Sequence, residues 1–190
     1  GMYIDVSMLD CQIAILENAI ARYLSKNEIP KPMGSRHPSI APFEAFKTKD
    51  SHIIIAAGND KLFENLCNFL KIPEISKDTK FITNSKRSEN MDKLKIILEN
   101  KLKEKKTSEW VKGMEELKIP CGPIFNIKEA VENPQIRERN MIVKSFHKVV
   151  GEFRTAGNPI KMSSYNDSTT RGDIPDLDEH RDKIIKEFCN

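Results

Sequence analysis

The sequence predicts an α+β fold, in which a small α/β domain lies between two flanks of different character. Segments that alternate like strands occur at about 43–57 and 141–156, beside segments with the apolar spacing of helices. At 190 residues the chain is long enough to bury a proper core. The sequence contains no internal repeat and no low-complexity segment, so it does not predict a repeat architecture.

The opening segment predicts a short strand followed by a long apolar helix. Residues 3–6 alternate like a strand, and Ser7 with Asp10 has the form of a capping box. We expect the helix to run to about Leu24. Its apolar side chains form two neighbouring stripes, Leu9, Ile13, Leu16, Ile20 and Leu24 in one and Met8, Ile15 and Ala19 in the other. Such a helix needs cover on more than half of its circumference, either from this chain or from a partner.

The remaining elements are predicted from periodicity and from capping signals. In order, they are a hairpin at 43–57, helices at 60–70, 90–102 and 108–117, an extended passage at 119–123, a helix at 126–132, a turn at 133–134, strands at 141–149, 152–156 and 159–162, and a helix at 178–188. Thr107 is the expected cap of the helix at 108–117, and Asn126 with Glu129 forms a second capping box. Pro73 is expected to stop the helix before it, because proline cannot continue helical hydrogen bonding.

Composition and charge exclude several classes of protein. The chain has 31 Lys and Arg against 28 Asp and Glu, and the two signs are interleaved, as in residues 101–106. A nucleic-acid footprint would be a basic stripe, so no nucleic-acid partner is expected. The sequence shows no signal peptide and no apolar run long enough for a bilayer, so we expect a cytoplasmic protein without membrane contact. Gly1 before Met2 is typical of an expression tag, so Met2 is the expected start of the reading frame.

No motif in the sequence forms a complete catalytic or metal-binding set. Phosphate-loop, dinucleotide-binding, zinc-protease and nucleophile-elbow motifs are all missing from it. The residues that could bind a metal are scattered: Cys11, Cys67, Cys121, Cys189, His37, His52, His147 and His180. Cys121 is the best candidate for a nucleophile, but a lone cysteine in an apolar setting is more often inert packing. Glu179 and His180 are adjacent on a helix and do not face each other.

Residues 34–43, GSRHPSIAPF, form the stretch most compatible with a ligand. Prolines at 30, 32, 38 and 42 keep the backbone extended, and Gly34 lets a ligand approach the main chain closely. His37 is the one side chain there that could bond a ligand as donor or acceptor near neutral pH. The residues alone favour a stiff linker over a ligand-binding loop.

Several segments resemble one protein family in sequence and in order. They are IDVSMLD, GSRHPSIAPF, IIIAAGNDKLFENLC, KIPCGPIFNIKEAVENPQIRERNMIV, GNPIKMS and DEH. Together they resemble the class III coenzyme A transferases. These include formyl-CoA:oxalate, carnitine and bile-acid CoA-transferases, and the α-methylacyl-CoA racemases are relatives. The resemblance runs from about Tyr3 to Phe188 and corresponds to the C-terminal half of a family member.

The resemblance implies a protein of two domains, of which this chain is one part. Family enzymes have a large Rossmann-like domain with a small domain inserted into its chain, and two subunits interlock. By this resemblance, residues 1–41 are the end of the large domain and a linker, 42–120 are the small α+β domain, and 121–190 are the return linker and the C-terminal segment of the large domain. The apolar helix then belongs to the large domain, and we expect residues 9–24 to lie at the interface of a homo-oligomer.

The resemblance also implies the chemistry. Family enzymes move CoA through an aspartyl-CoA thioester, and their nucleophilic aspartate lies upstream of the segment that matches Tyr3. No catalytic residue is therefore expected in this chain, a CoA thioester is the expected substrate, and no metal is expected. In the family, a loop lies over the acyl group. The residues of this chain that correspond to it are the expected substrate-binding residues: Gly34, Ser35, Arg36, His37 and Pro38. The lack of a glycine run in this loop argues against oxalate as the acceptor. Asp178 stands where relatives commonly have glycine.

The expected function is therefore the C-terminal portion of a CoA-transferase that acts on an acyl-CoA and a carboxylic acid. Two alternatives remain open. A fragment of an acyl-CoA racemase would carry the same segments, because its acid and base residues would also lie upstream. A non-catalytic remnant, or an isolated domain, would fold and associate without performing chemistry.

Overall fold

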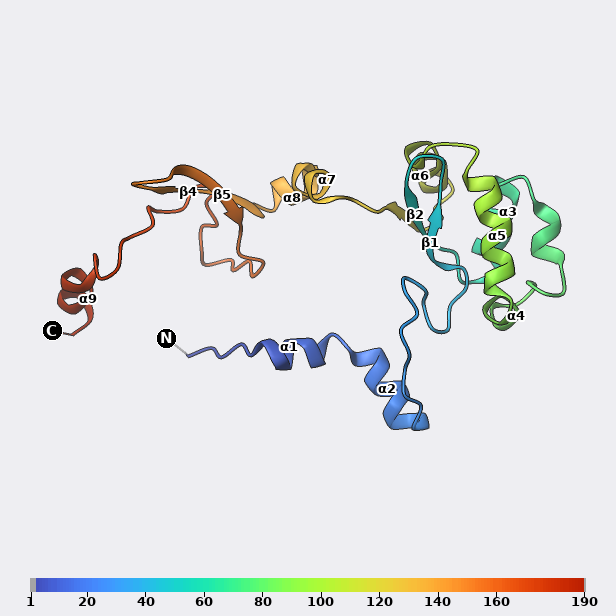
Figure 1. Cartoon of the computed structure of the whole chain (residues 1–190), viewed down its shortest axis with the longest axis horizontal. Helices are drawn as coiled ribbons and strands as arrows, with labels where there is room; N and C mark the ends of the chain where they lie inside the picture. Colours follow the sequence, from blue (N-terminus) through green and yellow to red (C-terminus); the bar gives the residue numbers. More distant parts are fainter. Residues whose placement is uncertain (1–2, 190) are drawn as a thin grey trace. The chain divides into compact units, whose positions relative to one another are not determined.

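The computed structural model describes residues 3–189, and Figure 1 shows their helices and strands. The fold is α+β, as the sequence predicts. The chain divides into two units, Gly1–Ile124 and Phe125–Asn190. The division into 1–41, 42–120 and 121–190 stays a prediction. The expectation for Gly1 and Met2 falls outside the described residues.

The opening segment differs from the prediction in two respects. Tyr3–Val6 form no strand, and the long helix is two short ones, α1 (Met8–Ala14) and α2 (Glu17–Lys26). The break is a tightened turn in which the Leu16 amide donates to the Ile13 carbonyl at 3.0 Å. Neither helix has a buried residue in the structure as described. Because most helical stability comes from packing against other elements, apolar periodicity alone does not keep this helix continuous.

The first sheet contains the predicted hairpin. Strands β1 (Phe43–Lys47) and β2 (His52–Ala56) pair antiparallel, and β3 (Cys121–Pro123) pairs antiparallel with β2, giving the order β1-β2-β3. The short third strand lies in the passage that the prolines were expected to keep extended. Asp50 in the hairpin turn accepts from the Thr107 amide at 2.9 Å and from its hydroxyl at 3.0 Å. These donors, the amide foremost, lower the pKa of the Asp50 carboxyl.

Helices cover this sheet, mostly where periodicity predicts them. They are α3 (Asp60–Phe69), the 3-10 helix η1 (Pro73–Lys77), α4 (Asn84–Glu89), α5 (Met91–Leu102) and α6 (Thr107–Glu116). The prediction that Thr107 caps α6 is wrong. Thr107 is the first helical residue and Lys106 precedes it as the cap, because the Thr107 hydroxyl is bonded to Thr48 and Asp50 instead. The polar segment that forms α4 gave no signal in the sequence.

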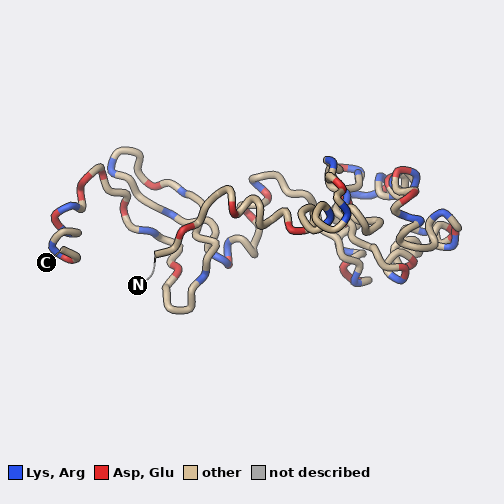
Figure 2. Tube along the Cα trace, turned by 90° about the horizontal axis from the view of Figure 1, so that it is seen from below, with Lys and Arg blue, Asp and Glu red and all other residues tan. Residues whose placement is uncertain are grey.

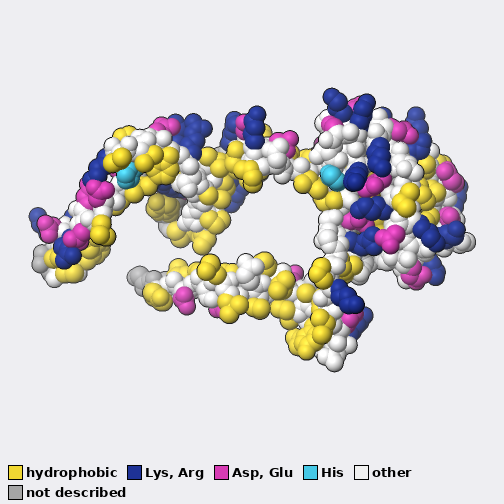
Figure 3. Space-filling view, in the orientation of Figure 1, with side chains coloured by type: hydrophobic (Ala, Val, Ile, Leu, Met, Phe, Trp, Pro, Cys, Tyr) yellow, Lys and Arg dark blue, Asp and Glu magenta, His cyan; other side chains and the backbone are white. Residues whose placement is uncertain are grey.

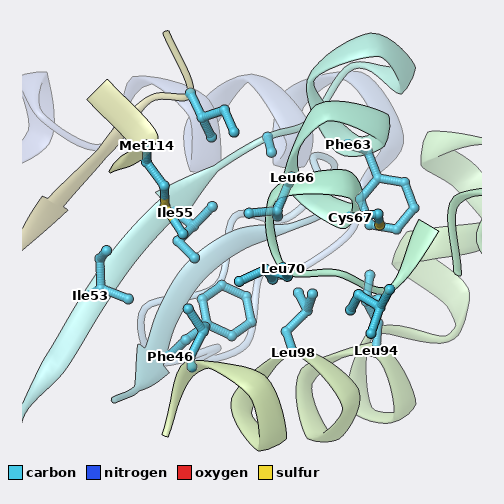
Figure 4. Close-up of a cluster of buried hydrophobic side chains, with 14 of the residues drawn as sticks. Phe46, Ile53, Ile55, Phe63, Leu66, Cys67, Leu70, Leu94, Leu98 and Met114 are labelled. Carbon is cyan, nitrogen blue, oxygen red and sulfur yellow. The ribbon is translucent and has the colours of Figure 1, made fainter. Parts of the chain in front are cut away.

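One hydrophobic core holds the sheet to its helices (Figure 4). Phe46, Ile53 and Ile55 of the sheet are fully buried, as are Leu66 of α3, Leu94, Leu98 and Leu102 of α5 and Met114 of α6. Complete burial of each such side chain is worth about 1.5–3 kcal/mol. This core makes the hairpin and its helices a rigid support for the segments attached to them.

The second unit is built from α7 (Ile127–Glu132), α8 (Pro134–Glu138), strands β4 (Ile142–His147) and β5 (Gly151–Ala156), and α9 (Arg181–Phe188). The predicted capping box is present, since Asn126 Oδ1 accepts from the Glu129 amide and the Glu129 carboxylate from the Asn126 amide. Asp178 stands at the position where the resembled family commonly has glycine. Its φ is +68°, a conformation that glycine adopts without strain.

The predicted third strand at 159–162 is wrong. Residues 169–171 lie beside β4 instead, because the Lys144 amide donates to the Thr169 carbonyl at 2.9 Å and the Arg171 amide to the Lys144 carbonyl at 2.8 Å. Within the part of this unit that the structure describes, Val143 and Ser145 are the only buried residues. The unit therefore has almost no core of its own.

Acidic and basic residues are interspersed along the trace of both units (Figure 2). Of the helices in residues 3–189, none combines the length and the apolar character needed to cross a membrane.

Candidate functional site

The predicted loop at 34–38 lies along the outer edge of β1. The His37 amide donates to the Phe43 carbonyl at 2.9 Å, and Ser35 Oγ accepts from the Ala45 amide at 3.0 Å. Gly34 has a φ of +65°, so the turn into the loop uses the left-handed conformation that glycine tolerates best. The loop thus supplies hydrogen-bond partners to backbone groups of β1 that would otherwise be unpaired at the edge of the sheet.

Arg36 fixes the same loop to β1 and to α5, through one carboxylate on each. Its Nε donates to Glu44 Oε1 at 3.0 Å and its Nη2 to Asp92 Oδ1 at 2.6 Å. Glu44 is buried and also pairs with Lys95, whose ammonium donates to the Ala45 carbonyl at 2.9 Å. The hydrogen bond from Arg36 lowers the pKa of the Asp92 carboxyl. The guanidinium is therefore committed to holding the loop in place.

His37 has one ring nitrogen engaged by its own loop. Nδ1 accepts from the Ser39 amide at 3.2 Å and from the Ile40 amide at 3.1 Å. The ring stacks on Phe43, with centroids 5.2 Å apart and an angle of 7° between the planes. Because Nδ1 is an acceptor, the proton of the neutral ring is assigned to Nε2. Nε2 has no partner among the described residues, so it can donate a hydrogen bond to a ligand.

A shallow hollow of about 450 Å³ adjoins this loop. Its walls are mostly apolar and come from the segment that follows the loop, the sheet, the start of α3 and the start of α4: Ile40, Phe43, Ala56, Gly58, Asn59, Leu62 and Asn84. Asn84 fixes the residues that follow the loop, because its Oδ1 accepts from the Ala41 amide at 2.9 Å and its Nδ2 donates to the Ser39 carbonyl at 2.7 Å. A Cβ at position 58 would lie 2.0 Å from Ile40 Cγ2, so Gly58 lets the loop approach the strand end closely. The arrangement suits an apolar group with a polar end near His37.

The structure thus brings the predicted residues together but gives them different tasks. Ser35 and Arg36 bond to the protein itself, while Gly34 and Pro38 shape the backbone. His37 keeps a polar atom, Nε2, for a ligand. The hollow was missed by sequence reasoning, since Asn84 lies 45 residues from Ser39 and no local pattern links them. Whether these residues bind substrate stays a prediction.

The other chemical candidates do not form sites. Burial raises the pKa of the Cys67 thiol to about 12, and it also raises that of Cys121, so both thiols stay protonated at neutral pH. The Glu179 carboxylate accepts from the Asp176 amide at 2.6 Å. Within residues 3–189, no cluster of three or more His, Cys, Asp or Glu is arranged to hold a metal ion.

Sequence comparison finds relatives along the whole chain. Acetyl-CoA:oxalate CoA-transferase of Acetobacter aceti is 37% identical over 189 residues, which are 100% of this chain and 47% of that protein. Succinyl-CoA:glutarate CoA-transferase of Homo sapiens is 35% identical over 187 residues, 98% of this chain and 42% of that protein. The chain therefore spans about half the length of the curated relatives that it matches.

Solved structures agree with the sequence comparison. A CAIB/BAIF family protein from Brucella suis has a TM-score of 0.74 and 33% identity, covering 98% of this chain and 48% of its own. Rv3272 from Mycobacterium tuberculosis, with a TM-score of 0.70 and 22% identity, shares the fold over 87% of this chain and 42% of its own. CoA-transferase family III matches residues 1–181, nearly the entire sequence. The chain belongs to CoA-transferase family III.

Proposed function

We propose that this chain is the C-terminal portion of an enzyme that transfers coenzyme A from an acyl-CoA thioester to a carboxylic acid. The observation that carries the proposal is the match to family III along 181 residues, together with curated CoA-transferases at 37% and 35% identity. The CoA thioester is then a substrate, and no metal takes part. By the family resemblance, the nucleophilic aspartate and its aspartyl-CoA intermediate belong to a segment upstream of Tyr3.

The acceptor proposed here is a small dicarboxylic acid. The relatives named above act on oxalate and on glutarate, and a further relative from Haloarcula hispanica is named for mesaconate. The argument against oxalate from the missing glycine run stays untested, and the relative named for oxalate weakens it. In this proposal the loop at 34–38 positions the substrate. His37 Nε2 donates to a substrate oxygen, and the adjoining hollow receives an apolar part of the acyl-CoA.

The test supplies the part of a family member that this chain does not span. The chain is fused behind the preceding half of the Acetobacter aceti relative, and CoA transfer from acetyl-CoA to oxalate, or from succinyl-CoA to glutarate, is assayed. We expect transfer by the fusion and none by the chain alone or by the preceding half alone. Epimerisation of a 2-methylacyl-CoA without CoA transfer would favour the racemase. A folded fusion that catalyses neither reaction would favour a non-catalytic remnant.

We further propose that the chain associates with a second copy through residues 9–24. Leu9 is 70% exposed and Leu24 is 76% exposed, and Figure 3 shows hydrophobic side chains gathered over α1 and α2. At about 25 cal/mol per Å², burying several hundred Å² of such surface favours association. Sedimentation is expected to show a dimer or larger species at micromolar concentration. Leu9→Glu combined with Leu24→Glu should give a monomer, whereas a monomeric unmodified chain would contradict the proposal.

A further inference from the structure

A second hollow lies within the unit of residues 125–190, away from the loop at 34–38 in sequence. It encloses about 790 Å³ between α7, α8 and one face of the β4–β5 hairpin. Val131, Ile142 and Ala156 form an apolar part of its lining, while Arg137, Lys144 and Arg154 bring positive charge to it. Glu132 is the one acidic residue in that lining. Its size lies within the range of about 300–1,000 Å³ that is common for sites of small molecules.

The arrangement of cations in this hollow is unfavourable without an anion. Lys144 and Arg154 are register partners on neighbouring strands, and like charges directly opposite each other destabilise a sheet. Lys144 Nζ does pair with a carboxylate, that of Glu152 at 3.5 Å, but both side chains are about half exposed. An exposed pair of this kind contributes little, so it does not compensate for the opposed cations.

The arginines of the hollow also differ from most others in the chain. Arg22, Arg36, Arg87, Arg171 and Arg181 each pair with a carboxylate. Arg137 and Arg154 make no side-chain hydrogen bond or ion pair to any residue that the structure describes. A guanidinium binds a carboxylate or a phosphate through two parallel hydrogen bonds, which makes two unpaired arginines at one hollow a suitable anion receptor.

We propose that this hollow binds a small organic anion that carries at least two carboxylate or phosphate groups. The charged groups of the ligand bind Arg137 and Arg154. The same ligand neutralises Lys144, which lies on β4 opposite Arg154. The apolar part of the ligand rests on Val131, Ile142 and Ala156. The hollow belongs to the second unit, whereas the loop at 34–38 belongs to the first, and the proposal does not depend on the CoA-transferase proposal.

The test is calorimetric titration of the 190-residue chain at low ionic strength with two probes, pyrophosphate and glutarate. Saturable binding of one ligand per chain is expected for at least one probe, and the stronger probe identifies phosphate or carboxylate as the preferred group. Arg137→Gln and Arg154→Gln are each expected to weaken binding about tenfold, because each removes a charge-assisted contact. Arg137→Lys should also weaken it, since lysine keeps the charge but loses the bidentate geometry.

Arg139→Gln is the matched control. It removes the same charge close to α8, but Arg139 lies outside this hollow, so binding should stay within twofold of the unmodified chain. Arg154→Gln should leave the melting temperature unchanged or raise it, because the opposed cations are relieved. Failure of both probes to saturate the chain would overturn the proposal. Equal weakening by Arg139→Gln would also overturn it, since binding would then follow net charge alone.

Discussion

Arg87→Met is expected to lower the free energy of unfolding of the first unit by about 2–4 kcal/mol. Arg87 is completely buried and lies on α4. Its guanidinium donates to the Ala41 carbonyl at 2.7 Å, the Phe81 carbonyl at 3.0 Å and the Gly58 carbonyl at 2.9 Å. Methionine fills a similar volume but leaves these carbonyls without donors.

The size of the effect follows from the burial of the acceptors. A buried carbonyl without a partner costs about 1–3 kcal/mol, and the bonds to Ala41 and Phe81 are buried. Part of this loss is offset, because methionine avoids the cost of desolvating a cation. The ion pair with Asp60 at 2.8 Å adds little to the sum, since the Asp60 side chain is 68% exposed. The carbonyls thus account for most of the loss.

Urea unfolding followed by the fluorescence of Trp110, the single tryptophan, measures this change in the unit concerned. Arg87→Lys should lose about half as much stability, because one ammonium cannot reach carbonyls in several directions. Lys86→Met is the matched control on the same helix, and its exposed pair with Glu89 predicts a loss under about 0.5 kcal/mol. If Arg87→Met and Lys86→Met are equally stable, the assignment of Arg87 as a structural centre is wrong.

Arg87 shows where sequence reasoning stops. It lies in the polar segment NSKRSEN, where an exposed charge is the ordinary expectation, and its acceptors are 6, 29 and 46 residues away. By contrast, the hairpin and the helices of the core follow from alternation and from spacing of apolar residues, which are local properties. The caps at Ser7 and Asn126 were likewise visible, because each needs only residues within one turn.

The errors have a common physical cause as well. The predicted helix that was to run to about Leu24 divides at Ile15. No residue of α1 or α2 is buried in the structure as described, and periodicity predicts an apolar face without saying what covers it. The strand at 159–162 has no partner because residues 169–171 occupy the edge of β4. In the candidate site, proline, glycine and histidine identified the loop. The buried Glu44 beside it gave no such signal, because its two partners are Arg36 of the loop and Lys95 of α5, which is 51 residues away.

His37→Ala in the fusion enzyme is expected to lower kcat/KM by roughly 5- to 150-fold, which corresponds to a lost hydrogen bond of about 1–3 kcal/mol. The reason is that Nε2 has no partner among the described residues and is proposed to donate to a substrate oxygen. The alanine variant also removes the acceptor of the Ser39 and Ile40 amides. A fall in rate could therefore come from a distorted loop, and a second variant must separate the two causes.

His37→Asn provides that separation. An asparagine oxygen accepts backbone amides two or three residues ahead, so it replaces Nδ1 and preserves the loop while removing Nε2. If Nε2 binds substrate, kcat/KM falls as far in His37→Asn as in His37→Ala, with little change in melting temperature. His147→Asn is the matched control, because His147 Nδ1 accepts from the Val149 and Val150 amides in the same way in the β4–β5 turn. That variant should keep kcat/KM within about twofold. Full activity in His37→Asn would show instead that His37 serves only the shape of its loop.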